Sequence, residues 1–145
     1  SRGESIFKYL INCYIKYGLY VERLISITKE GKDGANQIIS IMKKFRESPP
    51  KKLGNIHIHY IDDYLLSISR NLKNNQVKKI SLPKENVLIF TLEDKSRISL
   101  RPSGTEPKIK FYFSVNSFYN KRLPFKMQQK QLNKKIDLFV NDIIT

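Results

Sequence analysis

Cysteine is nearly absent from this sequence, since Cys13 is the only one among 145 residues. A single cysteine excludes an internal disulfide framework and fits a reducing compartment, so we expect a cytoplasmic protein. Long apolar runs are also missing, because none approaches the roughly 20 residues that cross a bilayer, and we expect no membrane partner. The first residues show no signal-peptide pattern. The chain does not begin with methionine, which favours a fragment of a longer polypeptide.

Acidic residues are scarce relative to basic ones. The sequence has 13 Asp plus Glu against 27 Lys plus Arg, which gives a net charge of +14. Such an excess motivates the hypothesis of a basic nucleic-acid-binding module, and so does the stretch 121–135, which carries six basic residues and no acid. A solvated helix face explains that stretch equally simply, and the chain lacks runs that mix arginine with aromatic residues for base stacking. We therefore expect no nucleic-acid partner and keep this module as the alternative function.

The hydrophobic pattern predicts an alternation of helices and strands. Helices are expected over 4–17, over about 34–46 with Asp33 as its N-cap, and from Pro124 to the end. Strands are expected over 20–29, 55–61, 86–93, 96–100 and 109–115. Residues 65–85 are polar, lack a clean period and are predicted to be a loop. The order predicts an α+β domain with a small antiparallel or mixed sheet of four to five strands backed by two helices, plus an extra N-terminal helix.

Two pairs of residues could suggest a metal site. His57 and His59 are expected to share one face of a predicted strand, and its other face is expected to carry Ile56, Ile58 and Tyr60. Asp62-Asp63 follows at the end of this strand. A zinc site needs at least one further protein ligand, and none lies at a suitable spacing. We interpret the histidines as solvent-facing strand residues and the aspartates as a strand cap, and we predict no metal site in this chain.

One decapeptide, from Arg101 to Lys110, has the composition of a phosphate site. Arg101 offers a planar fork of donors that fits phosphate oxygens, and Ser103 and Thr105 add hydroxyl donors. Gly104 has no Cβ, so backbone N–H groups can approach a ligand closely. Lys110 adds a positive charge at the start of the next strand. Taken alone, the composition also suits an ordinary tight turn.

The string Arg-Pro-Ser-Gly-Thr-Glu-Pro-Lys, residues 101–108, closely resembles the phosphosugar-binding loop of the α-D-phosphohexomutase family, which includes phosphoglucomutase and phosphomannomutase. All eight motif positions match, and the likeness extends over roughly residues 5–145, with the bacterial phosphoglucomutase/phosphopentomutase branch as the most similar. The resemblance implies that residues 19–145 form the family's C-terminal domain, which is similar to the TATA-box-binding-protein fold. Residues 1–18 would then be the terminal helix of the preceding domain.

The resemblance also implies a function. Family members exchange a phosphoryl group between the 1- and 6-positions of a hexose, using a phosphoserine, Mg²⁺ and a bisphosphorylated intermediate. Those parts belong to earlier domains, so we expect no catalytic residue here, Mg²⁺ only in the full-length enzyme, and a fragment that is inactive alone. By position, Arg101, Ser103, Gly104 and Thr105 match the contacts to the non-reacting phosphate, and Lys110 matches a basic residue of some relatives. The expected partners are a hexose phosphate or bisphosphate and the upstream domains; a standalone regulatory copy is a third hypothesis.

Overall fold

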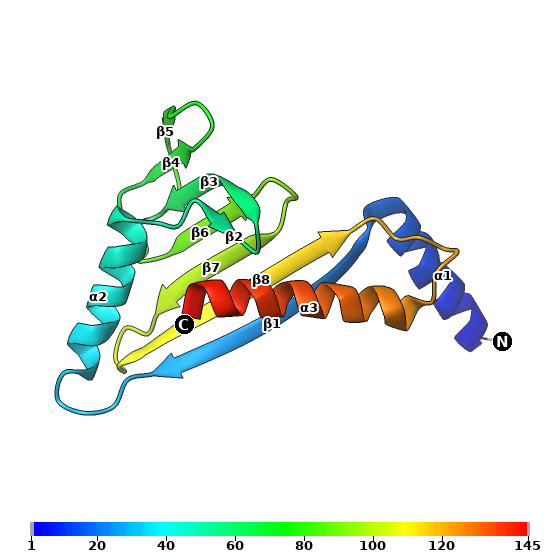
Figure 1. Cartoon of the computed structure of the whole chain (residues 1–145), viewed down its shortest axis with the longest axis horizontal. Coiled ribbons are helices and arrows are strands. Elements are labelled where there is room, and N and C mark those ends of the chain that lie inside the picture. Colours follow the sequence, from blue (N-terminus) through cyan, green and yellow to red (C-terminus); the bar gives the residue numbers. More distant parts are fainter. Residues whose placement is uncertain (1, 145) are drawn as a thin grey trace.

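The computed structural model describes residues 2–144, with side chains from residue 6 onward. In this range the helices are α1 (Arg2–Tyr17), α2 (Gly34–Glu47) and α3 (Phe125–Ile144). The strands are β1 (Leu19–Thr28), β2 (Lys52–Leu53), β3 (Ile56–Asp63), β4 (Ile68–Asn71), β5 (Val77–Lys79), β6 (Leu88–Leu92), β7 (Arg97–Pro102) and β8 (Lys108–Ser117). Figure 1 shows the long strands β1 and β8 side by side, with α3 lying along them.

The strands form one antiparallel sheet in the order β1-β8-β7-β6-β3-β4-β5, with the short β2 paired to β3. This confirms the predicted α+β class with an N-terminal helix, although the described sheet has eight strands rather than four to five. The strand pairs β6–β7 and β7–β8 follow each other along the chain, so short connections fix their registers. The second of these connections is the predicted phosphate loop.

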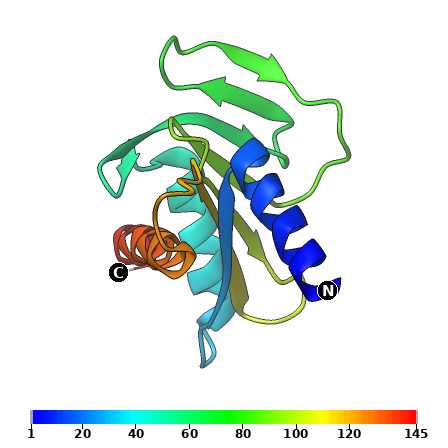
Figure 2. The same cartoon turned by 90° about the vertical axis from the view of Figure 1, so that its right-hand side faces the viewer.

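The two faces of the sheet differ sharply. On β8, Ile109, Phe111, Phe113 and Val115 are buried, and the residues between them are exposed or half-buried. Because strand side chains alternate between faces, one face carries the core and the other stays open. Figure 2 shows α2 and α3 together on one side of the sheet. The buried stripe of α3 completes the core with Leu132, Ile136, Phe139 and Ile143.

The prediction of a loop over 65–85 is wrong in part. This stretch contains β4 and β5, which pair with each other and extend the sheet beyond β3. All four residues of β4 are half-buried and all three of β5 are exposed, so neither strand shows the alternation from which strands are recognised. The asparagines that suggested a loop form the turn between them, where Asn71 and Asn74 side chains accept backbone N–H bonds.

The face assignment on β3 fails at one residue. Ile58 is buried as predicted, but Tyr60 is 37% exposed and Ile61 is buried instead. The register of β3 against β6 shifts between Ile58 and Tyr60, which is a β-bulge. A bulge inserts one extra residue and so moves the following side chains to the opposite face. The His59 ring consequently stacks on the Tyr60 ring, with centroids 3.9 Å apart.

Helix α1 lies beyond the end of the sheet, next to the start of β1 (Figure 1). It ends as predicted at Gly18, whose φ of +88° is a left-handed conformation that favours glycine, and whose N–H donates to the Tyr14 carbonyl at 2.8 Å. Tyr14 packs on the rings of Tyr119 and Phe125 and so joins α1 to the rest of the fold. The division into residues 1–18 and 19–145 stays a prediction. No helix in the described part of the chain is long and apolar enough to span a membrane.

Candidate functional site

The predicted cations Arg101 and Lys110 lie opposite each other on neighbouring strands. Arg101 is near the end of β7, Lys110 is near the start of β8, and the two are direct partners in the ladder. Their neighbours Leu100 and Ile109 are fully buried, so alternation places both cations on the open face. Like charges directly opposite one another destabilise a sheet. This arrangement therefore costs folding free energy that an anion bound between the cations would offset.

Backbone hydrogen bonds fold the loop between these strands into a tight turn. The Ser103 N–H donates to the Lys108 carbonyl at 3.0 Å, and the Lys108 N–H donates to the Glu106 carbonyl at 2.7 Å. The Ser103 Oγ accepts the N–H of Thr105 at 3.4 Å and that of Glu106 at 3.1 Å. A hydroxyl has two acceptor lone pairs and one donor proton. With its lone pairs engaged by the turn, Ser103 keeps its O–H proton to donate to a ligand.

The loop borders a hollow of about 650 Å³. Four of the five predicted residues line it, namely Arg101, Ser103, Gly104 and Lys110. Thr105 does not line it, and its N–H is turned toward Ser103. The remaining lining residues, for which the sequence suggested no contact to a ligand, are Pro102, Glu106 and Lys108. Three basic residues and one acidic residue therefore line the hollow.

Gly104 lies on the open rim of the loop. A Cβ added there would meet no heavy atom within 4 Å, and Gly104 is not among the glycines with positive φ. The protein's own packing and backbone therefore do not require glycine at this position. The absence of a side chain instead leaves the backbone accessible from the hollow, as a bound anion would need.

The connection between β1 and α2 supports the loop from behind. The Lys29 N–H donates to the Pro107 carbonyl at 2.8 Å. A Cβ on Gly34 would lie 2.1 Å from the Lys29 carbonyl oxygen and 3.1 Å from the Pro107 Cβ, so only glycine fits there. These long-range contacts are absent from any local pattern, and the sequence alone could not assign Gly34 a role in positioning the loop. They hold the loop in place before any ligand arrives.

A second, smaller hollow of about 350 Å³ adjoins the first on the open face and shares Arg101 and Lys110 with it. Its other lining residues are largely apolar or aromatic: Leu24, Tyr64, Glu85, Val87, Ile89, Ser99 and Tyr112. A hydrogen bond from the Tyr112 hydroxyl to the Glu22 carboxylate raises the pKa of Tyr112, because it stabilises the protonated phenol. The open face therefore offers a largely apolar and aromatic surface directly beside the two cations.

The predicted strand cap at Asp62-Asp63 is found at Asp63. Its Oδ1 accepts the N–H groups of Leu65 and Leu66 at 3.0 and 3.1 Å, which turns the chain at the end of β3. Its Oδ2 pairs with the Arg46 Nε at 2.8 Å, and the Asp63 side chain is 1% exposed. A buried carboxylate with these partners stabilises the fold and is not available to a ligand.

Among the described residues, no three His, Cys, Asp or Glu side chains lie together as metal ligands do, so this part of the molecule offers no carboxylate set for Mg²⁺.

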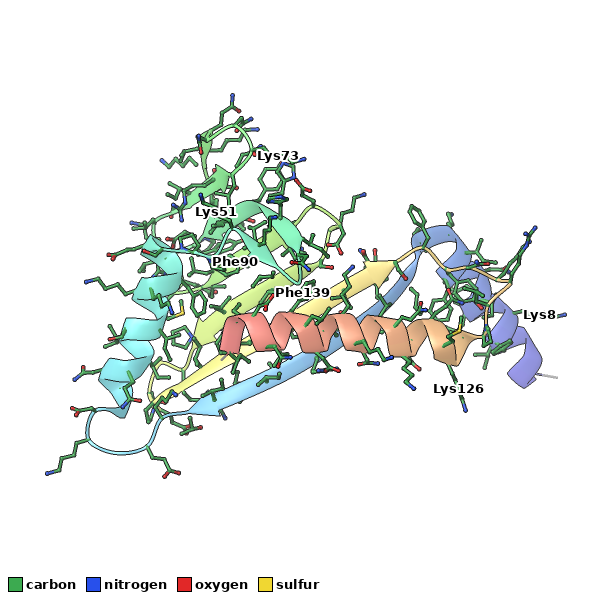
Figure 3. All side chains as sticks on the ribbon, viewed as in Figure 1. Lys8, Lys51, Lys73, Phe90, Lys126 and Phe139 are labelled. Atoms are coloured by element: carbon green, nitrogen blue, oxygen red, sulfur yellow. The ribbon has the colours of Figure 1, made fainter. Side chains whose placement is uncertain are left out.

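The basic stretch 121–135 lies on the β8–α3 connection and on α3. Lys126, Lys130 and Lys134 are exposed, and Figure 3 shows Lys126 pointing away from the sheet. Lys135 instead forms an ion pair with Asp94 in the β6–β7 hairpin. Burial raises the pKa of Asp94, but the bond to Lys135 and the N–H of Ser96 outweigh it and lower that pKa below its ordinary value. The charges of this stretch are thus partly solvated and partly structural.

Comparison with known proteins gives clear relatives. No family model matches the chain. The phosphoglucomutase of Staphylococcus aureus strain USA300 is 41% identical over 113 residues, which are 78% of this chain and 20% of that relative. The phosphoglucomutase of strain MSSA476 is 40% identical over 113 residues. The chain therefore spans about a fifth of the length of the curated relatives it matches.

A solved structure is also similar. The open form of pp63/parafusin, a phosphoglucomutase from Paramecium, aligns with 95% of this chain and 23% of its own, at 20% identity and a TM-score of 0.48. The sequence identity to the Staphylococcus aureus proteins is what confirms the resemblance carried by the loop motif.

Proposed function

This chain is homologous to phosphoglucomutases, and from that premise we propose that it is the phosphate-binding C-terminal domain of a phosphosugar mutase. Its task is to hold the phosphate that is not reacting, while upstream domains carry out phosphoryl transfer between the 1- and 6-positions of glucose or mannose. The single observation that carries the proposal is the hollow at the β7–β8 loop, where Arg101, Lys108 and Lys110 meet beside Ser103 and Gly104.

The donors of this hollow match the demands of a phosphate dianion. The guanidinium of Arg101 can engage two oxygens at once, and the ammonium of Lys110 supplies a second charge across the ladder. The free O–H of Ser103 supplies a neutral donor. Hydrogen bonds that involve a charged group contribute about 1.5–3 kcal/mol each. Together these groups would anchor one end of a sugar phosphate and orient its other end toward a reacting group elsewhere.

Thr105 needs a change of loop conformation to take part. Its N–H is engaged by Ser103, and it stands outside the lining of the hollow. The oxygens of a bound phosphate would compete with the Ser103 Oγ as acceptors for the N–H groups of Thr105 and Glu106. We propose that Thr105 turns toward the ligand on binding, which makes the loop one of the elements that close over the substrate.

The remaining machinery is assigned to other domains. We propose that residues 19–145 form the phosphate-binding domain, that residues 1–18 close the preceding domain, and that the nucleophile lies upstream. Mg²⁺ would neutralise charge on the transferred phosphoryl group when bound. The described residues provide no ligand cluster for it, so no step of the present proposal involves the ion.

The test is Arg101→Ala in the polypeptide that joins this chain to its upstream domains. The Michaelis constant for glucose 1-phosphate should rise by about tenfold to 150-fold, the equivalent of about 1.5–3 kcal/mol of lost binding. Thermal unfolding of the same variant should be unchanged or slightly stabilised, since a like-charge pair is removed. An unchanged Michaelis constant would reject the assigned role.

The isolated chain offers a second test. Because the nucleophile is assigned elsewhere, the 145-residue chain should show no mutase turnover with glucose 1-phosphate and its bisphosphate. Turnover that persists through repeated purification would contradict the division of labour between domains.

A further inference from the structure

Glu106 is the one acid that lines the hollow, and the binding of a phosphate gives it no task. We propose that Glu106 is a specificity-determining residue that selects phosphates carrying a hydroxyl group over phosphates that carry none. This inference rests on the proposed function and deepens it, because it states what else the ligand must bring to the same hollow.

The turn fixes the backbone of Glu106 on both sides. Its N–H donates to the Ser103 Oγ at 3.1 Å, and its carbonyl accepts the Lys108 N–H at 2.7 Å. Glu106 is exposed, and among the described side chains, residues 6–144, no ion pair involves its carboxylate. The backbone of Glu106 is therefore held in a preformed turn, and its carboxylate oxygens remain available to a ligand.

Electrostatics makes this carboxylate costly for a bare anion. A phosphate dianion placed among Arg101, Lys108 and Lys110 also comes near the negative charge of Glu106, which opposes binding. An ionised carboxylate can only accept hydrogen bonds. A sugar hydroxyl beside the phosphate can donate to it, and such a charge-assisted bond is stronger than a neutral one. Glu106 thus lowers the affinity for inorganic phosphate and simple phosphate esters through charge repulsion. For a polyol phosphate, a hydrogen bond from a hydroxyl group to the carboxylate offsets this repulsion.

The test compares three probes with graded hydroxyl content: inorganic phosphate, methyl phosphate and glucose 6-phosphate. Dissociation constants are measured by NMR titration of the ¹⁵N-labelled 145-residue chain and of its Glu106→Gln variant, which keeps the shape and removes the charge. The matched control is Glu47→Gln, because Glu47 is an exposed acid at the end of α2 away from the loop. In the variant Glu106→Gln, methyl phosphate should bind about threefold to tenfold more tightly while glucose 6-phosphate gains nothing or weakens. The control should leave all three constants unchanged.

The possible failures are distinguishable. If Glu106→Gln tightens methyl phosphate and glucose 6-phosphate by the same factor, or changes neither, the specificity role is overturned and the phosphate site stands. If the unaltered chain binds none of the three probes, or if Arg101→Ala leaves all constants unchanged, the proposed function fails and this inference fails with it.

Discussion

Two regions of this molecule are rich in cations, and they hold those cations differently. Arg101, Lys108 and Lys110 converge on one hollow at the end of β7 and the start of β8. On α3, Lys126, Lys130 and Lys134 follow one another every fourth residue and are exposed. Three residues at this spacing extend over about 12 Å of helix axis. One region can surround a single small dianion, whereas the other presents its charges to solvent one by one.

The difference shows why net charge alone did not decide the function. Exposed charges are screened within a Debye length of about 8 Å at physiological ionic strength, so a spaced row attracts a small ligand weakly. The next turn of the same helix carries an acid, because Asp137 follows the row and pairs with Arg23 at 2.6 Å. At the hollow, by contrast, the register of β7 and β8 fixes the two cations, and the hydrogen bond from Lys29 to Pro107 holds the loop. The Ser103 hydroxyl adds a donor. Convergence of charges, more than their number, favours a phosphosugar ligand over a nucleic acid.

The largest expected effect comes from removing two charges from each region in turn. The double variant Arg101→Met/Lys110→Met and the double variant Lys126→Met/Lys130→Met have the same net charge. The first should weaken binding of glucose 6-phosphate to the chain by at least about 2 kcal/mol, since charged hydrogen bonds are lost. The second should change it by less than about 0.5 kcal/mol, as surface substitutions usually do. Calorimetric or NMR titration measures both, and equal losses would remove the distinction between the two regions.

A smaller effect is expected from substitution of two glycines near the loop: Gly104 should affect phosphate binding, and Gly34 should affect stability. Gly104→Ala places a methyl group in open space, so stability should change by less than about 0.5 kcal/mol, while phosphate binding should weaken by about 1 kcal/mol because the backbone is shielded. Gly34→Ala forces a methyl group against the Lys29 carbonyl and should destabilise the fold by about 1–3 kcal/mol. Chemical denaturation and ligand titration separate the two outcomes. Loss of stability in Gly104→Ala would show that glycine serves the turn itself.

The smallest effect is expected on stability, from removal of the ion pair that Lys135 of α3 forms with Asp94. Asp94 has a pKa below its unfolded value of about 3.9, so its pairing with Lys135 stabilises the fold above that pH. This stabilisation is lost as the pH falls through the lowered pKa of the folded state. Lys135→Met should therefore cost roughly 0.5–1 kcal/mol at pH 7 and less at pH 3, which lies below the unfolded pKa. Urea unfolding at both pH values checks this, and an equal cost at both would reject the ion pair as the cause. Lys130→Met, which breaks no described ion pair, is the control.

Much of the candidate site was accessible from the sequence because the motif is contiguous. The turn between Arg101 and Lys110 was expected, but the register that sets these two residues opposite each other was not predicted. The role proposed for Glu106 and the position of Gly34 were not predictable either, since they depend on which residues meet across the hollow and behind the loop. Thr105 shows the reverse, because its residue type suits a phosphate while the turn engages its N–H elsewhere.

The fold was predictable where periodicity was strong. The strand expected over 109–115 is β8, and the helix expected from Pro124 to the end is α3. The hairpin of β4 and β5 was missed because it is half-buried or exposed throughout, and Tyr60 was misplaced because a bulge leaves no local signal. Asp33 stands at the N-cap of α2 as predicted, but its side chain makes no capping hydrogen bond.

The most direct test of the account is to locate where a hexose phosphate binds. Glucose 6-phosphate is titrated into the ¹⁵N-labelled chain, and the amide shifts of all assigned residues are followed, with glucose as the uncharged control. If the phosphate site lies at the β7–β8 loop, saturable shifts should be confined to residues 101–110 and the adjoining residues of β1 and β8, and glucose should cause none. Shifts that centre on α3, or that are equal for glucose and its phosphate, would contradict it.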